Sequence, residues 1–349
     1  MKPPAPRGRL VAAVREAHRA LLARHPHLRF LERWGLSLAS LANGIVILVA
    51  FRRGTEHLPW IVGVLFLLWF GVVVFEHVRR SLAARGRQLV LVALDYTIQS
   101  LHHTLLLSLL PIYYASTTLA SPNATFLLLL AGAVLLTSVD PWYRATIRLH
   151  PRAIVVLFAF CFFAALAVAL PLVGLRSTWA LIASGALSML ALTPAIRRAT
   201  DTSWRTAWLL AGLAAAVAAS VLWPLRRWIP PAPLHLAFGT FARTVERREP
   251  VQPVVRISAA DLKAWGSVWC FTAVWAPAGL REPITHAWSR DGVPVASTRL
   301  APIRGGRPGG FRTYSRRTDL GPDPTGHWTV DVLTAHGQLI GRVRLTVTR

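Results

Sequence analysis

The chain has 349 residues, of which 54% are hydrophobic and 15% are charged, and its mean hydropathy is +0.45. This composition excludes an ordinary soluble protein and indicates an integral membrane protein. The net charge of +24 is typical of nucleic-acid-binding proteins, but the basic residues flank apolar runs instead of forming one stripe, so we expect no nucleic-acid partner.

Residues 1–33 carry eight basic and two acidic side chains. Apolar residues between Leu10 and Leu21 recur at helical spacing and Pro26 interrupts them, which predicts a basic amphipathic arm on the cytoplasmic side. The arm either lies on anionic lipid headgroups or is a solvated tail that only sets the orientation of the chain.

Seven apolar runs follow the arm. At 1.5 Å per residue, about 18 residues come close to the roughly 30 Å hydrocarbon thickness of a bilayer. The runs occupy residues 34–51, 58–75, 88–114, 125–142, 154–173, 179–196 and 206–223. The first and third runs contain polar residues, so either one could instead be a packed or re-entrant helix. We predict a seven-span helical membrane domain over residues 34–223.

The arginines predict the orientation of these spans. The arm and every second connection together hold 18 basic residues, whereas the remaining connections hold 3. By the positive-inside rule the N-terminus lies in the cytoplasm, and an odd number of spans puts the C-terminal region on the other side. Arg226 and Arg227 are exceptions, because they lie on the side where few positive charges are expected.

Residues 224–235 are rich in proline and contain Trp228, which predicts a short, stiff linker with an anchor at the membrane surface. Beyond the linker the pattern changes to short, β-branched or aromatic runs separated by turn residues. These runs occupy residues 268–275, 284–289, 293–300, 311–316, 327–334 and 340–348.

Two turn signals join these runs, a strong one at Asp291-Gly292 and a weaker one at His336-Gly337. Seven or eight strands in about 115 residues predict an all-β domain over residues 236–349, a sandwich of immunoglobulin-like size. Its predicted core includes Trp269, Trp275 and Trp328.

Several spaced motifs of this domain occur together in one order. They are Arg247-x-Glu249-Pro250-Val251, His286-x-Trp288, Asp291-Gly292, Arg312-Thr313-x-Ser315, Gly326-x-Trp328-x-Val330-x-Val332 and Gly337-x-x-x-Gly341. With them, residues 236–349 resemble a bacterial C-terminal domain family of unknown function that often follows membrane helices. The resemblance implies an inner-membrane protein of the bacterial envelope whose β domain lies in the periplasm, and it brings no activity or site with it.

The third apolar run carries a polar cluster. Asp95, Gln99 and His102 share one helix face and His103 flanks it. A functional interpretation is proton relay or metal binding inside the membrane. The structural alternative pairs Asp95 with a loop arginine and leaves the histidines hydrogen-bonded between helices. We predict no cofactor and no metal site.

Two groups in the β domain are candidate binding residues. In residues 303–317, Arg304 and Arg307 lie among glycines, and alternation places Arg312, Tyr314 and Arg316 on one strand face. Exposed backbone amides and guanidinium groups suit phosphate or carboxylate groups of envelope material, and the alternative is a mobile hairpin with a solvated basic face. His286 and Trp288 also share a face, as a binding site or as core residues.

The sequence contains no nucleotide-binding glycine loop, zinc-protease helix or nucleophile elbow, so we expect no catalytic residues and a binding protein more than an enzyme. The predicted function is to present a periplasmic β-sandwich to an anionic envelope polymer, a glycolipid or a periplasmic protein. The alternative is a membrane-embedded transporter, or an enzyme on lipid-linked substrates, that uses Asp95 and His102.

Overall fold

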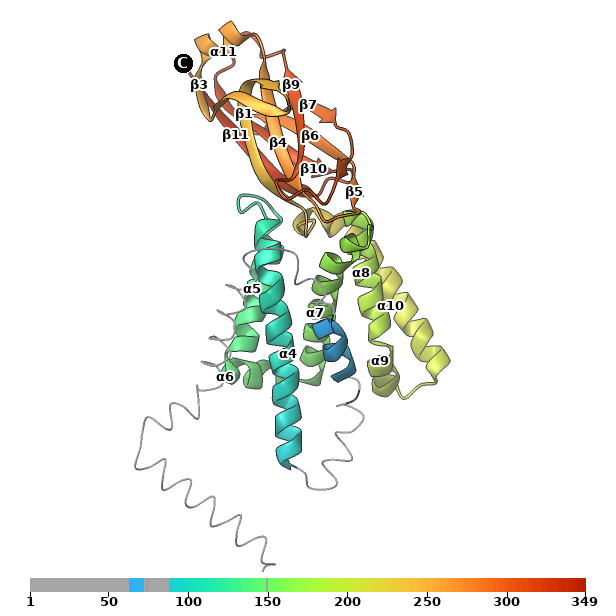
Figure 1. Cartoon of the computed structure of the whole chain (residues 1–349). Helices are drawn as coiled ribbons and strands as arrows, with labels where there is room; N and C mark the ends of the chain where they lie inside the picture. Colours follow the sequence, from blue (N-terminus) through green and yellow to red (C-terminus); the bar gives the residue numbers. More distant parts are fainter. Residues whose placement is uncertain (1–62, 72–73, 75–87, 149) are drawn as a thin grey trace, which may run out of the picture.

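The computed structural model describes residues 63–71, 74, 88–148 and 150–349. In these residues a helical part comes first and an all-β part follows, and the β part stands on one end of the helices (Figure 1). The predicted arm over residues 1–33 and the first predicted span over residues 34–51 lie outside the described residues.

Seven labelled α-helices form the described helical part. They are α4 (Gln88–Ala115), α5 (Ala124–Ser138), α6 (Asp140–Tyr143), α7 (Pro151–Leu172), α8 (Ser177–Ala191), α9 (Thr193–Thr200) and α10 (Trp204–Leu225). Residues 63–71 are also helical, a π-helical turn covers Arg144–Arg148, and a 3-10 turn, Arg226–Trp228, follows α10. Ser203 caps α10, because its hydroxyl accepts a hydrogen bond from the amide of Thr206 at 3.2 Å.

Two of the described helical segments are long and apolar enough to cross a membrane, Arg152–Leu172 and Trp204–Trp228. Two bent pairs, Ala124–Ser138 with Pro141–Ile147 and Ser177–Ala191 with Thr193–Thr200, raise this number to four if each pair forms one span. Helix α4 has sufficient length, but it is not among these candidates because its polar side chains lower its hydropathy. The described residues thus account for two to four of the seven predicted spans.

The helical part has a packed interior and an apolar exterior. Leu105, Leu109 and Tyr113 of α4 are fully buried against α5 and α7. On α10, by contrast, Leu209 is 75% exposed and Leu213 64% exposed. A helix surface with such large exposed apolar side chains is typical of contact with lipid.

Helices α8 and α10 approach each other through small residues, as membrane helices commonly do. Ala207, Ala211 and Ala215 of α10 are buried. At Gly185 of α8, an added Cβ would lie 2.2 Å from Leu222 Cδ1, so a larger residue here requires the Leu222 side chain to move.

The all-β part consists of two main sheets that face each other. Its strands are β1 (His235–Glu246), β2 (Glu249–Val254), β3 (Arg256–Ser258), β4 (Val268–Trp275), β5 (Arg281–Glu282), β6 (Ile284–Arg290), β7 (Val293–Arg299), β8 (Ile303–Arg304), β9 (Phe311–Arg317), β10 (Gly326–Thr334) and β11 (Leu339–Thr348). Sheet A has the order β2-β1-β4-β9, sheet B has the order β3-β11-β10-β6-β7, and β5 pairs with β8. A short helix, α11 (Ala259–Trp265), follows β3.

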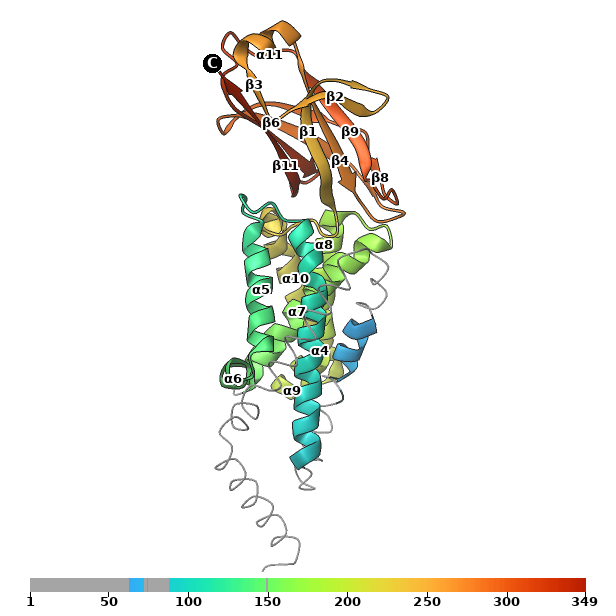
Figure 2. The same ribbon diagram turned by 60° about the vertical axis from the view of Figure 1, so that its left-hand side comes forward.

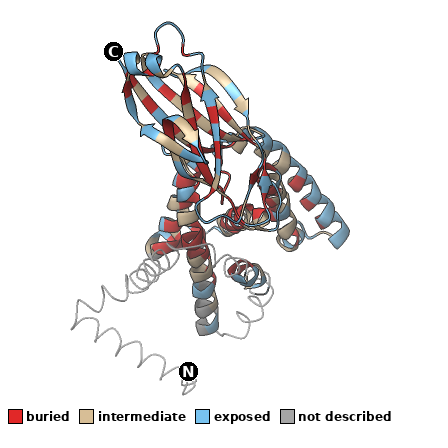
Figure 3. Ribbon diagram, turned by 45° about the horizontal axis from the view of Figure 1, so that its top comes forward, coloured by how far each residue is buried: buried red, intermediate tan, exposed pale blue. Residues whose placement is uncertain are grey.

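Side chains from both sheets form the core between them. Phe241 and Cys270 of sheet A pack with Trp288, Trp328 and Leu345 of sheet B. Buried and exposed residues alternate along the strands, as the red and pale blue segments of Figure 3 show. The C-terminus lies at the end of the sandwich far from the helices (Figure 1).

The all-β prediction is confirmed. All six strands predicted from alternation form, and their ends differ from the prediction by at most one residue. Asp291 and Gly292 have φ values of 49° and 81°, as a tight two-residue hairpin turn requires. The predicted number of strands, seven or eight, is too low, because the structure has eleven. Three of them, β3, β5 and β8, have only two or three residues each.

The predicted linker is packed between the two parts. Helix α10 continues to Leu225, and residues 229–234 are all buried. Ile229 and Ala232 join the core of the helices, whereas Leu234 joins a cluster at the near end of the sandwich. Strand β1 begins at His235, so no exposed tether separates the helices from the sandwich.

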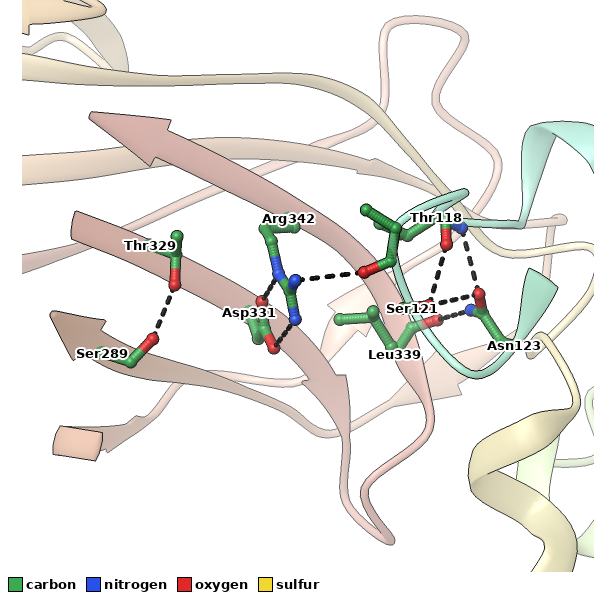
Figure 4. A network of polar contacts seen from close by, with 9 residues as sticks. Thr118, Ser121, Asn123, Ser289, Thr329, Asp331, Leu339 and Arg342 are labelled. Carbon is green, nitrogen blue, oxygen red and sulfur yellow. Dashed lines mark hydrogen bonds and ion pairs between the residues drawn. The ribbon is translucent and has the colours of Figure 1, made fainter. Parts of the chain in front are cut away.

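Polar contacts fix the sandwich on the helices (Figure 4). The Asn123 side-chain amide, just before α5, donates to the Leu339 carbonyl at 3.2 Å. Arg342 holds Asp331 with two hydrogen bonds of 2.5 and 2.8 Å and also donates to the Ala120 carbonyl at 3.4 Å. The loop between α4 and α5 is thereby tied to strands β10 and β11.

Arg226, one of the two exceptions to the charge pattern, has a structural role at this contact. Its guanidinium lies 4.5 Å from the centre of the Trp223 ring, and its Nε donates to the His336 carbonyl at 2.8 Å. The charge therefore serves to join the end of α10 to the β10–β11 turn, which explains a positive charge on the predicted outer side.

Candidate functional site

The outer face of sheet A, which points away from the sandwich core, carries a row of exposed side chains. In β9, Thr313 and Ser315 are buried, whereas Arg312, Tyr314 and Arg316 are exposed, as the alternation predicts. Strand β9 is an edge strand of sheet A, so one side of this row borders solvent directly.

Aromatic residues of β4 and β1 extend the row across the sheet. Trp269 lies opposite Arg316 in the ladder, and Phe271 lies opposite Tyr314, so their side chains share the outer face. The Trp269 and Tyr314 ring centres are 5.5 Å apart, and the Arg316 guanidinium lies 5.6 Å from the Trp269 ring centre.

A second aromatic pair completes the surface. Phe238 of β1 is 51% exposed, and its ring centre lies 6.2 Å from that of Phe271. Phe271 itself is only 2% exposed, although it points away from the core. We name this surface the aromatic–arginine face; it comprises Phe238, Trp269, Phe271, Arg312, Tyr314 and Arg316.

The two arginines of this face differ in their partners. Arg312 forms an ion pair with Glu249 of β2, in which both side chains are about half exposed. Exposed ion pairs contribute only about 0–1 kcal/mol, so breaking this pair would cost the folded chain little. Arg316 has no carboxylate partner among the described residues, and its charge lies over Trp269.

Arg304 and Arg307 do not belong to this face. Arg304 is an exposed residue of β8, and the Arg307 guanidinium lies 4.9 Å from the centre of the Phe311 ring. The structure thus separates the predicted arginine group into a strand row and a loop.

The glycine loop is packed and does not offer its amides to a ligand. The amides of Gly305, Gly306 and Gly310 donate to backbone carbonyls at 3.0–3.1 Å. At Gly305, an added Cβ would lie 1.7 Å from the Pro277 carbonyl oxygen. The predicted cradle of exposed amides is therefore wrong for these three positions, because Gly305 and Gly306 pack closely against the loop after β4 and Gly310 packs against β4 itself.

His286 and Trp288 lie in the core, with exposed fractions of 0% and 1%. The two ring nitrogens of His286 hydrogen-bond with Thr272 Oγ1 at 3.0 Å and Ser315 Oγ at 2.8 Å. Trp288 Nε1 donates to the same Ser315 oxygen at 3.1 Å. Burial lowers the pKa of His286 to about 4, so at neutral pH an uncharged imidazole links the two sheets.

The four residues of the predicted intramembrane polar cluster lie on α4. Gln99 donates to the Thr137 carbonyl at 3.2 Å, and His103 Nδ1 lies 3.1 Å from Ser138 Oγ, so both residues link α4 to α5. His102 is completely buried; its Nδ1 lies 2.8 Å from the Ile98 carbonyl, and its Nε2 has no hydrogen-bond partner in the described part of the chain. Asp95 lies on α4, but its side chain is outside the described residues.

No group of three His, Cys, Asp or Glu residues that could hold a metal ion occurs among the described residues. The His103–Ser138 contact matches the structural interpretation, hydrogen bonding between helices. His102 does not, because its Nδ1 bonds within its own helix.

The position of Trp269 differs from the prediction. It lies on the outer face of sheet A, whereas Trp328, 2% exposed, is in the core as predicted. Cys270 faces inward, so its neighbour Trp269 faces outward, but alternation alone does not show which face of β4 is the inner one. The prediction placed Trp269, Trp275 and Trp328 in the core, and Trp275 is also only half-buried, with its ring stacked on that of His235.

Comparison with known proteins gives two matches to protein families. A model described as a family of unknown function (DUF5924) matches residues 14–268, and a model described as a protein of unknown function (DUF2914) matches residues 281–347. The second match confirms that the C-terminal strands resemble a family of unknown function. No curated protein and no solved structure matches the chain.

The border between the two matches falls inside the sandwich. Strands β1, β2 and β3 belong to the first match and strands β5 to β11 to the second, although residues from both matches share one core. Because the first match covers most of the 349 residues, the chain belongs to the family of unknown function DUF5924.

Proposed function

We propose that this chain is a bacterial inner-membrane protein that binds an anionic envelope glycan on the aromatic–arginine face of its sandwich. In this proposal seven spans anchor an immunoglobulin-like domain in the periplasm, and the N-terminus is cytoplasmic. The single observation that carries the proposal is the row of exposed Tyr314, Arg316 and Arg312 beside Trp269 and Phe238.

The exposed apolar surface of the helices and the unequal distribution of arginines support the membrane location. Helices α7 and α10 meet the length and hydropathy of a span. The polar contacts between the helices and the sandwich hold the aromatic–arginine face in one orientation relative to the membrane, whichever ligand it binds.

The chemistry of the face supports a glycan ligand. Sugar rings present apolar C–H faces that pack on aromatic rings, and Tyr and Trp combine a large apolar surface with a polar group. Guanidinium groups bind carboxylates and phosphates with paired hydrogen bonds. From Leu234 onward the chain has sixteen basic and eight acidic side chains, a net charge of +8, which favours an anionic polymer over a neutral one.

The strand geometry suits an extended ligand. Residues four apart on a strand are separated by about 13 Å, because a strand rises about 3.3 Å per residue. Arg312 and Arg316 therefore lie at the two ends of a line with Tyr314 between them. A polymer with regularly spaced acidic groups can contact both arginines while a sugar ring rests on the aromatic side chains.

The test measures binding of the full-length chain in detergent to polygalacturonate, with neutral dextran as the control polymer. Replacing Tyr314 and Arg316 together with alanine is expected to weaken binding about tenfold or more, equivalent to about 1.4 kcal/mol. Arg344→Ala is the matched control, because Arg344 is exposed on β11 of the opposite sheet. Equal binding by the double variant and the wild type, or equal affinity for dextran, would refute the proposal.

A second candidate function rests on His102. Its Nδ1 must donate to the Ile98 carbonyl, so Nε2 carries a free lone pair in an apolar interior. A buried acceptor without a partner is destabilising by about 1–3 kcal/mol, which favours a role for this atom in transport or in chemistry on lipid-linked substrates, together with Asp95. A deletion strain whose phenotype is restored by the chain without its sandwich, but not by the same chain carrying His102→Leu, would favour this function over glycan binding.

A further inference from the structure

Three arginines gather where the sandwich meets the helices. Arg176 immediately precedes α8, Arg281 lies in β5 and Arg304 lies in β8. Figure 1 shows β5 beside the end of α8, and Figure 2 shows β8 at the same end of the sandwich. All three side chains are exposed.

Two of these arginines face each other directly. In the β5–β8 ladder, Arg281 is the partner of Arg304, and Glu282 is the partner of Ile303. Directly opposed residues of an antiparallel pair project their side chains on the same face. The buried pair Glu282–Ile303 points inward, so the two guanidinium groups project together toward solvent.

Glu282, the carboxylate next to Arg281 in β5, points away from the opposed guanidinium groups. Glu282 is 1% exposed, and its carboxylate accepts a hydrogen bond from the Ser177 amide at 2.9 Å. Burial raises the pKa of Glu282, whereas the hydrogen bond from the Ser177 amide and the charge of Arg176 lower it. Among the described residues, none of the three arginines forms an ion pair.

Neighbouring arginines behave differently. Arg226 lies over Trp223 and donates to the His336 carbonyl, and Arg307 lies over Phe311. The opposed pair of Arg281 and Arg304 has no such partner in the described part of the chain. Like charges placed directly opposite each other destabilise a ladder, so an anion that binds both of them removes a repulsion that the folded chain otherwise retains.

The surroundings indicate where the anion comes from. Trp179, on the first turn of α8, and Trp223, near the end of α10, are 49% and 39% exposed, and both rings contact His336. Exposed tryptophans at the ends of apolar helices are typical of the headgroup level of a bilayer. Arg176 lies three residues before Trp179, so the arginines lie at the same level if α8 and α10 span the membrane.

We propose that Arg176, Arg281 and Arg304 bind the phosphodiester headgroup of an anionic phospholipid in the leaflet below the sandwich. The proposal rests on the membrane location given above, but not on glycan binding. Guanidinium groups hold phosphate oxygens through paired hydrogen bonds, and the lipid supplies the phosphate at a fixed depth beside β5 and β8. A bound headgroup would hold the sandwich close to the bilayer surface.

The test uses thermal unfolding of the full-length chain in neutral detergent, with phosphatidylglycerol, phosphatidylcholine or inorganic phosphate added. We expect phosphatidylglycerol to raise the midpoint of the wild type, and the other two additions to leave it unchanged. Replacing all three arginines with glutamine should reduce the phosphatidylglycerol shift by at least half. The matched control replaces Arg256, Arg344 and Arg349 with glutamine, removes the same charge from the far side of the sandwich, and should keep the full shift.

A single substitution gives a second readout that does not depend on the folding of the triple variant. Arg281→Gln removes the like-charge repulsion, so without lipid its unfolding midpoint should be at or above that of the wild type, while its response to phosphatidylglycerol falls. An undiminished response in both variants would overturn the proposal, and an equal shift with inorganic phosphate would overturn the assignment to a lipid. If reporter fusions place the sandwich outside while the lipid response is absent, the lipid site is wrong and the membrane location stands.

Discussion

The side chain of Gln338 joins the sandwich to the helices through Thr178. The Thr178 hydroxyl donates to Gln338 Oε1 at 2.8 Å, and Gln338 Nε2 donates to the Ile229 carbonyl at 3.3 Å. Both side chains are buried, Gln338 at 1% exposure and Thr178 at 0%. The side-chain amide of Gln338 therefore forms hydrogen bonds with both the first turn of α8 and the segment that follows α10.

Gln338→Leu should loosen this contact. It leaves the Thr178 hydroxyl and the Ile229 carbonyl without partners, which costs about 1–3 kcal/mol for each buried group. Limited proteolysis and hydrogen exchange of residues 229–234 measure the effect, and both rates should rise. The double variant with Thr178→Val is the control, because it removes the orphaned hydroxyl and should recover part of the loss. Unchanged protection in Gln338→Leu would show that the contact does not hold the two parts together.

Much of the sandwich could be predicted because strand alternation is a local property. Residues such as Val330 and Val332 alternate with polar neighbours, and the Asp291-Gly292 turn needs only its own backbone preferences. The β1–β2 hairpin gave no such signal. Its turn residues Arg247 and Arg248 have φ values of 48° and 63°, a conformation that arginine rarely adopts, so sheet contacts and not turn propensity impose it.

The contact between the two parts could not be read from the sequence. Thr178 and Gln338 are 160 residues apart, and neither belongs to a recognisable motif. Arg226 is an exception to the charge pattern, and its partner could not be predicted because the His336 carbonyl is a backbone group. The aromatic–arginine face was half predicted: β9 alternation gave Arg312, Tyr314 and Arg316, but Trp269 and Phe238 required the register of β4 against β9 and β1.

The His286 network predicts a loss of sandwich stability in acid. Burial lowers the pKa of His286 from 6.5 to about 4 in the folded chain, so the unfolded chain binds more protons between these values. The free energy of unfolding should therefore fall as the pH drops from about 6.5 to about 4, by about 3 kcal/mol in total. Hydrogen exchange of β6 amides, corrected for the intrinsic effect of pH, measures this change.

The control for the acid effect is His286→Leu. This variant loses the hydrogen bonds to Thr272 and Ser315 and should be less stable at neutral pH by about 1–3 kcal/mol. Its stability should nevertheless depend less on pH between 4 and 6.5. A wild type and a variant with the same pH dependence would show that another group causes the acid effect.

Glu282 should act in the opposite direction at the contact with α8. Burial raises its pKa in the folded chain, so the folded chain binds the extra proton. The contribution of Glu282 to the free energy of unfolding therefore decreases as the pH rises from 4.5, the ordinary pKa of this group, through its raised pKa in the folded chain. Glu282→Gln should remove this dependence, whereas Glu282→Ala should cost about 1–3 kcal/mol because the Ser177 amide loses its acceptor. Hydrogen exchange at the start of α8, measured as a function of pH, distinguishes the two variants. Identical pH dependence in both would show that the Glu282 carboxylate does not stabilise this contact.

The orientation of the whole chain is the prediction on which glycan binding depends. Alkaline phosphatase is active only outside the cytoplasm, so a fusion after Arg349 should be active and a fusion at the N-terminus inactive, because 18 basic residues lie on one side of the predicted spans and 3 on the other. Deleting residues 206–223 removes one span and should make the C-terminal fusion inactive. Replacing the same residues with an unrelated apolar helix of 18 residues is the control and should keep the fusion active. An inactive C-terminal fusion on the intact chain would place the aromatic–arginine face in the cytoplasm, where no envelope glycan is present, and the proposed function would then be wrong even if the face binds anions in solution.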